Sequence, residues 1–208
     1  MTKNSSRVKL IHSTQVLMLA RGYSATGVDD ICRDAGLSKG AFYHQFTSKE
    51  ELAIAALASF YEAGLQKLLG IDVQGVAPER RLFAFLDVLS KQGQDFWKSG
   101  CLIGSVASEM AGTSPALQTE VSRLFTQTAK ALEPLFEPFV ASIETESLSA
   151  SALAEQLLVV VEGAIVMSRA HADPKRINRA IARFSEQLRW LCRGLRTVKA
   201  PAKKAKRR

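Results

Sequence analysis

The polar side chains best suited to binding or catalysis gather between residues 38 and 49, a run that holds two serines, two lysines, a tyrosine and a histidine. An ammonium, a phenol, an imidazole and a hydroxyl group all suit contacts with phosphates and with base edges. The sequence offers no nucleophile–base pair and no paired carboxylates, which argues against an enzyme. The run therefore favours recognition of a nucleic acid.

Three short helices within about the first 45 residues must position this run. Apolar residues at helical spacing precede Gly22, which is expected to end the first helix. A second helix is expected over 27–35, and a third follows the turn Gly36-Leu37-Ser38 and runs to about residue 46. Two short helices joined by such a turn form a helix-turn-helix, whose second helix enters the major groove of DNA.

The first residues of that recognition helix should face the base edges. Lys39 can reach a guanine or a phosphate and Ala41 a thymine methyl group, while Gly40 permits close approach. Thr26, with the amide groups of the helix start beside it, is expected to hold a phosphate. The full set of expected DNA contacts is Thr26, Ser38, Lys39, Gly40, Ala41, Tyr43, His44 and Lys49.

A longer segment, RGYSATGVDDICRDAGLSKGAFYHQFTSKEEL over residues 21–52, resembles the N-terminal domain of TetR-family transcriptional regulators. The resemblance covers roughly residues 7–55. It implies an all-helical homodimer with a C-terminal domain that binds a ligand or partner. It also implies that Thr26, Lys39, Tyr43, His44 and Lys49 contact DNA.

The net charge of +8 is weak support for DNA binding by the N-terminal helices, because the surplus lies at the C-terminus. Residues 1–49 carry +4, residues 50–192 carry −4, and residues 193–208 carry +8. The terminal basic segment is too polar to bury anything, so it is expected to be disordered. It is either a solvated end or a nonspecific electrostatic tether to DNA.

The remaining sequence keeps helical periodicity and shows no alternation typical of strands. We therefore predict an all-α fold with a helix-turn-helix domain at 1–47, a helical regulatory and dimerisation domain at 48–197, and a basic disordered tail at 198–208. Pro134 and Pro138 are expected to end or kink the helix that opens at Ser114.

The regulatory domain is expected to hold a pocket between helices, lined by apolar residues. Its Gly100-Cys101-Leu102 resembles the subgroup that contains the repressor of N-ethylmaleimide reductase, whose members sense electrophiles or oxidants through this cysteine. Cys101 would precede a short helix, where the helix dipole favours the thiolate. The alternative is that Cys101, like the aromatic residues, only packs. The candidate sensor residues are Cys101, Phe96, Trp97, Met110, Phe125 and Met167.

The last two helices are expected to form a four-helix bundle with a second copy. Small residues allow close helix approach, and apolar residues supply the faces. The expected interface residues are Leu157, Val160, Gly163, Ala164, Ile181, Phe184 and Leu188. The same faces could instead form the core of a single chain.

Other protein classes fit less well. We see no signal peptide and no apolar run of the roughly 18 residues that a membrane span needs. The three cysteines and three histidines are scattered, so no metal site, disulfide or cofactor is expected, and the protein should be cytoplasmic. A helical adaptor would not need the Gly36–Gly40 turn. A nonspecific DNA-binding protein is the serious alternative, and the ratio of specific to nonspecific affinity distinguishes it.

Overall fold

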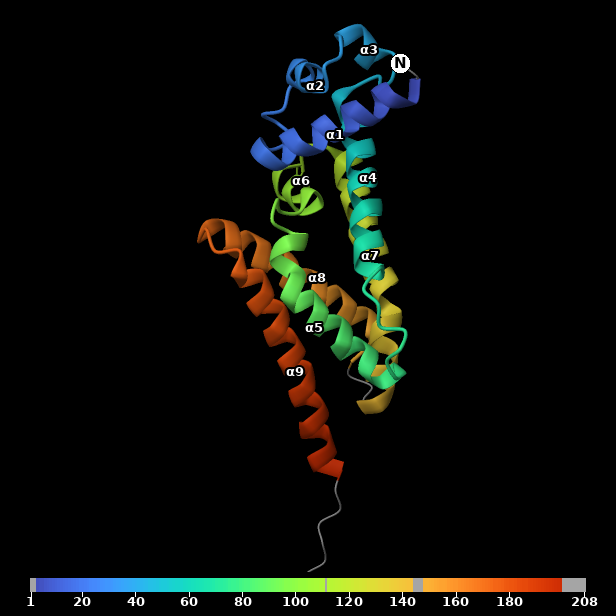
Figure 1. The fold of residues 1–208 in the computed structure, drawn as a ribbon, viewed down its shortest axis with the longest axis vertical. Helices are drawn as coiled ribbons and strands as arrows, with labels where there is room; N and C mark the ends of the chain where they lie inside the picture. The colour runs from blue at the N-terminus through green and yellow to red at the C-terminus, as the bar shows by residue number, and fades with distance from the viewer. Residues whose placement is uncertain (1–2, 111, 144–147, 200–208) are drawn as a thin grey trace, which may run out of the picture. The chain divides into compact units, whose positions relative to one another are not determined.

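The computed structural model describes residues 3–110, 112–143 and 148–199 (Figure 1). The all-α prediction is confirmed, because every regular element in these ranges is a helix. The chain divides into two compact units, one of residues 1–71 and 97–129, and the other of residues 72–96 and 130–208. These units are defined by packing, and the expected functional boundaries at 47 and 197 stay a prediction.

The first unit contains six elements in whole or in part. They are α1 (Lys3–Arg21), α2 (Val28–Ala35), α3 (Lys39–Tyr43), α4 (Lys49–Leu69), α6 (Leu102–Met110) and the N-terminal half of α7 (Pro115–Ile143). Helix α1 packs against α2, α4 and α6. The core beneath the helix-turn-helix consists of Leu10, Ile31, Cys32, Phe42, Phe46 and Leu52.

Local signals in the sequence explain where these short helices begin and end. Gly36 ends α2 in the left-handed conformation at φ 65°, and the next amide group donates to the Cys32 carbonyl at 2.9 Å. Ser38 caps α3 by accepting a hydrogen bond from the Ala41 amide group at 3.1 Å. Ser48 caps α4 in the same way through Glu51 at 3.0 Å. The turn at Gly36-Leu37-Ser38 that the sequence predicted is confirmed.

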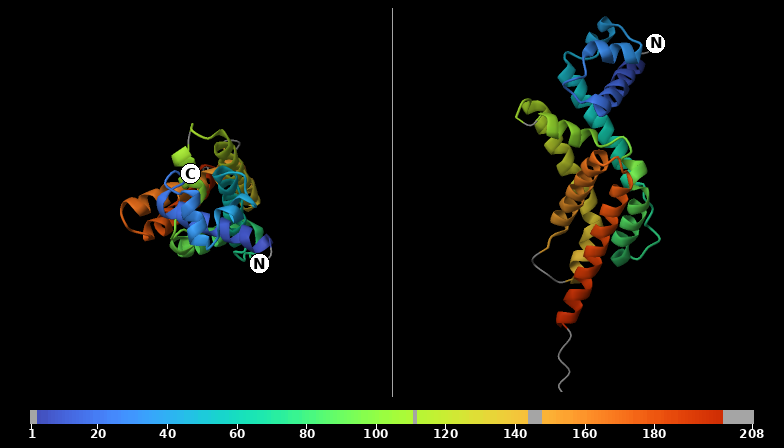
Figure 2. Two further views of the ribbon diagram at one scale, coloured as in Figure 1. Left: turned by 90° about the horizontal axis from the view of Figure 1, so that it is seen from above. Right: turned by 90° about the vertical axis from the view of Figure 1, so that its left-hand side faces the viewer.

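The second unit contains α5 (Pro78–Phe96), the rest of α7, α8 (Ala150–Ala170) and α9 (Lys175–Lys199). Helices α8 and α9 form a hairpin, and α5 lies against α9 (Figure 2). Gly93 lets α5 approach α9 closely, since an added Cβ would lie 3.0 Å from a methyl group of Ile177. Asn178 ties these helices by accepting from the Gln94 amide group at 2.6 Å and donating to the Lys91 carbonyl.

Pro134 and Pro138 were expected to end or kink this helix, and the expected end was wrong, because α7 continues through both prolines to Ile143. The two prolines lie four residues apart, so the carbonyl groups that lose their partners share one side of the helix. Pro134 is exposed and Pro138 half-buried, while Phe136 and Phe139 are buried in the core. Packing of the aromatic side therefore holds the helix together.

Helix α9 also extends beyond its expected end, so residues 198 and 199 of the predicted tail are helical. The rest of that tail, 200–208, lies outside the described residues. Helices α4 and α8 are long and apolar enough to span a bilayer by length and composition alone, although the sequence was expected to contain no such segment. Each packs within its own unit, α4 against α1 and α8 against α9.

Candidate nucleic-acid interface and regulatory surfaces

Helix α3 exposes the polar side chains that the sequence singled out. Phe42 faces the core and is fully buried, which turns the other sides of this short helix outward. Tyr43 is 61% exposed, and Lys39, Gly40 and His44 are exposed as well. An ammonium, a phenol and an imidazole thus lie on the outer surface of a helix whose buried side fixes its position.

Lys39 has an intramolecular partner on this surface. Its ammonium group lies 2.7 Å from the Asp29 carboxylate, and both side chains are 61% exposed. The hydrogen bond to Asp29 and the charge of that carboxylate raise the pKa of Lys39, so the lysine is fully charged at neutral pH. An exposed ion pair is weak and screened by salt, so a phosphate or a base edge can replace Asp29.

Three expected DNA contacts have other roles in the structure. Thr26 is 1% exposed, and its hydroxyl group donates to the Gly22 carbonyl at 2.7 Å, so this side chain cannot reach a phosphate. The hydroxyl group of Ser38 caps α3, and the half-buried Ala41 donates to it. The Thr26 expectation is corrected, because the residue closes the turn between α1 and α2.

Lys49 is also directed inward. Its ammonium group donates to the Tyr23 carbonyl at 3.2 Å and lies 4.0 Å from the centre of the Tyr23 ring. The expected phosphate contact is therefore replaced by a contact that joins the start of α4 to the turn after α1. The sequence did not predict Tyr23 as the partner of Lys49, because the two residues lie 26 positions apart.

Sequence reasoning missed Glu109, which contacts the same turn. Its carboxylate accepts hydrogen bonds from the Tyr23 and Ser24 amide groups at 2.7 and 2.6 Å. Burial alone would raise the pKa of Glu109, but hydrogen bonds from Ser24 and Tyr23 and the charge of Lys49 outweigh it and lower the pKa. No local sequence signal marks this contact, because its partners lie about 85 residues away.

The six candidate sensor residues are divided between the two units. Cys101, Trp97, Met110 and Phe125 belong to the first unit, and Phe96 and Met167 belong to the second. Cys101 is 7% exposed and directly precedes α6, as the sequence indicated. Its carbonyl accepts hydrogen bonds from the amide and hydroxyl groups of Ser105, at 3.0 and 2.9 Å.

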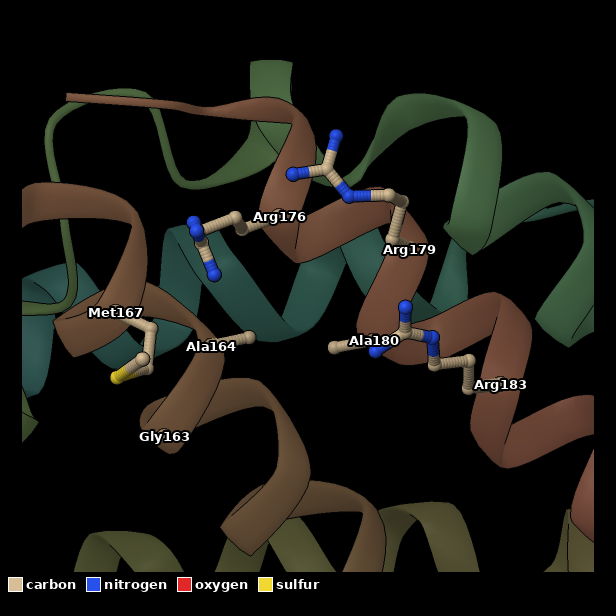
Figure 3. A pocket seen from close by; sticks show the side chains of 7 residues that line it. All are labelled: Gly163, Ala164, Met167, Arg176, Arg179, Ala180 and Arg183. Atoms are coloured by element: carbon tan, nitrogen blue, oxygen red, sulfur yellow. The ribbon is translucent and has the colours of Figure 1, made fainter. Parts of the chain in front are cut away.

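A cavity of about 480 Å³ lies between α8 and α9 (Figure 3). Its lining consists of Gly163, Ala164, Met167, Arg176, Arg179, Ala180 and Arg183. The neighbouring Asp173 forms ion pairs with Arg176 and Arg179. The lining thus carries three guanidinium groups, two of which pair with Asp173.

The expected dimer residues are mostly buried within one chain, which corrects their assignment. Five of them are at most 6% exposed, namely Leu157, Ala164, Ile181, Phe184 and Leu188. Val160 is half-buried and Gly163 is exposed. The amphipathic pattern identified a packed face, but that face is occupied by the chain's own helices.

A different face of the α8–α9 hairpin carries exposed apolar side chains. Val159, Val166 and Met167 on α8 are 67%, 62% and 46% exposed. On α9, Trp190 and Leu191 are 74% and 41% exposed. Large exposed apolar residues on two helices that pack against each other favour an interaction surface on this hairpin. We call these five residues, together with Gly163, the outer α8–α9 face.

Comparison with known proteins relates both halves of the chain to one family. Residues 10–56 match the model for bacterial regulatory proteins of the tetR family, and residues 78–184 match the tetracyclin repressor-like C-terminal domain. The HTH-type transcriptional repressor DhaR of Mycobacterium sp. (strain GP1) is 32% identical over 176 residues, which cover 80% of this chain and 83% of DhaR.

Two further comparisons concern NemR of Escherichia coli. The sequence of this HTH-type transcriptional repressor from strain K12 is 28% identical over 124 residues, which cover 59% of this chain and 62% of NemR. The crystal structure of its reduced form has a TM-score of 0.72 at 24% identity, and covers 86% of this chain and 95% of that chain. The structural likeness shows a shared fold.

Proposed function

The chain belongs to the tetR family of bacterial regulatory proteins, and we propose that it is a cytoplasmic repressor that binds a palindromic operator as a homodimer. As a DNA-binding transcriptional regulator it is not an enzyme. The observation that carries the proposal is the outer surface of α3, where Lys39, Tyr43 and His44 are exposed above the buried Phe42. A recognition helix needs this combination of a fixed inner side and a polar outer side.

The proposed DNA contacts follow from this surface. Lys39, Gly40, Tyr43 and His44 meet the duplex, with Lys39 exchanging Asp29 for a base or phosphate. Binding of the chain to duplexes selected from a random library tests the proposal. Selection of a defined sequence supports it, and equal affinity for all duplexes at matched salt contradicts it.

The outer α8–α9 face is the proposed contact with the second copy. Its five large apolar residues are exposed in the single chain, and Gly163 has open space above it. Arg183 of the neighbouring cavity is exposed, and so are Glu155 and Glu186 on the same two helices, so both charge signs are present at the surface of the hairpin. Apolar area with complementary charges is typical of homodimer interfaces.

We also propose that a small molecule, or modification of Cys101 by an electrophile or oxidant, releases the operator. Support comes from the resemblance of Gly100-Cys101-Leu102 to the NemR-like subgroup and from the position of Cys101 at the start of α6. Because Cys101 is only 7% exposed, a small reagent has easier access to this residue than a bulky one. Such an adduct weakens DNA binding by as much as it prefers the conformation that does not bind DNA.

A further inference from the structure

The turn between α1 and α2 holds a carboxylate from a helix far along the chain. The successive amide groups of Tyr23 and Ser24 point at the two carboxylate oxygens of Glu109, at 2.7 and 2.6 Å. Successive amide groups next to a residue in the left-handed conformation form a concave anion site. Here Gly22 is that residue, at φ 86°, and the bound anion is a side chain of α6.

Gly22 meets two requirements at this site. Its positive φ favours glycine, and an added Cβ would lie 2.8 Å from the Glu109 carboxylate. A side chain here would therefore push Glu109 away from the turn as well as strain the backbone. Glycine at position 22 therefore gives the turn both the backbone conformation and the space that the Glu109 carboxylate needs.

A second contact involves the start of α7, a few residues after Glu109. The hydroxyl group of Ser114, which caps α7, donates to the Glu50 carboxylate in the first turn of α4 at 2.5 Å. Lys49, the neighbour of Glu50, binds the carbonyl and ring of Tyr23. The end of α6 and the start of α7 therefore contact both the α1–α2 turn and the start of α4.

The turn leads directly into α2, which carries the recognition helix. Ile31 and Cys32 of α2 share the core with Phe42 of α3, and Asp29 of α2 pairs with Lys39. A change in the position of the turn is therefore passed to the outer surface of α3 through packed and paired side chains.

We propose that Glu109 is a positioning residue for DNA recognition, which fixes the α1–α2 turn and thereby ties the orientation of α3 to α6. The proposal rests on the proposed function, in which α3 reads DNA. Cys101 directly precedes α6 and Glu109 lies in its last turn, about 12 Å along the helix axis. A reagent that shifts α6 at Cys101 thus reaches the DNA-binding helices through Glu109.

The experiment compares the full-length chain with Glu109→Gln, using the duplex that the wild-type chain selects from a random library. Glutamine offers one acceptor oxygen for two amide groups and carries no charge, so one hydrogen bond is lost and the other is weakened. We expect affinity for the selected duplex to fall about tenfold. In amide NMR spectra, the proton signals of Tyr23 and Ser24 should move upfield.

Three further variants make the result specific. Glu120→Gln removes a carboxylate of α7, paired with Arg123 at 2.6 Å, and should leave affinity and both amide signals unchanged. Glu109→Asp keeps the charge but withdraws it by one methylene group, and should reproduce the loss of affinity. Gly22→Ala displaces Glu109 from the other side, so its effect should not add to that of Glu109→Gln.

Each outcome decides the matter. If Glu109→Gln or Glu109→Asp moves the two amide signals but keeps wild-type affinity, the positioning role is overturned while the proposed function stands. An equal loss in Glu120→Gln, or additive effects of Gly22→Ala and Glu109→Gln, also overturns it. If the wild-type chain selects no duplex, the proposed function fails, and this inference fails with it.

Discussion

The ammonium group of Lys49 lies 4.0 Å from the centre of the Tyr23 ring and donates a hydrogen bond to the Tyr23 carbonyl. This contact joins the start of α4 to the turn that follows α1. A lysine that the sequence assigned to a phosphate is thus part of the framework that supports the recognition helix.

The Lys49→Ala variant should therefore lose stability rather than a phosphate contact. We expect the free energy of unfolding to fall by about 1 kcal/mol, the typical contribution of a cation–π contact of this kind. Urea denaturation measures it. The salt dependence of DNA binding should keep its wild-type slope, and a slope reduced by about one would show that Lys49 does contact a phosphate.

Lys39 should behave differently, because its side chain is exposed on α3. The Lys39→Ala variant is expected to bind the selected duplex on the order of tenfold more weakly and to relax the sequence preference at one position. Binding curves with single-base variants of the duplex measure both effects. Lys67→Ala, an exposed lysine near the end of α4, is the matched control. An equal loss of affinity in the two variants would show that Lys39 is not a specific DNA contact.

The outer α8–α9 face can be tested without disturbing the core. Val166 is 62% exposed, so Val166→Arg should leave the folded single chain intact but place a charge in the proposed dimer contact. Light scattering at micromolar concentration should show a dimer for the wild type and a monomer for the variant. The control is Leu69→Arg, which changes an apolar residue that is 54% exposed on α4, and this variant should remain a dimer. A Val166→Arg variant that remains a dimer would place the interface elsewhere.

The cysteine proposal predicts selective loss of the response to reagents. Treatment with hypochlorite or a quinone should release the selected duplex from the wild type but not from Cys101→Ser. Cys192→Ser, which removes a half-buried thiol on α9, should respond like the wild type. If Cys101→Ser still releases DNA on treatment, another group is the sensor and Cys101 is a packing residue.

Local features of the fold were predictable from the sequence, because local chemistry determines them. Gly36, Ser38 and Ser48 act on amide and carbonyl groups within a few residues, so their roles as helix ends and caps could be read directly. The apolar side chain of Phe42 favours burial by residue type alone, and it forms the buried side of α3.

Features that depend on tertiary contacts were not predictable. Periodicity marked Leu157 and Ile181 as apolar faces, but it could not say that the same chain covers them. Pro134 is accommodated because packing elsewhere on α7 outweighs the lost hydrogen bond. The Glu109 contact with the α1–α2 turn has partners about 85 residues away and leaves no local pattern.

The most direct test of the central claim is selection of duplexes from a random library by the full-length chain. A two-fold dimer of α3 readers predicts an enriched palindrome with half-sites centred about 10 base pairs apart, or a multiple of that spacing. The selected duplex should bind at least about a thousandfold more tightly than random DNA at the same salt. Enrichment of no sequence, with equal affinity for selected and random duplexes, would contradict the account and identify the chain as a nonspecific DNA-binding protein.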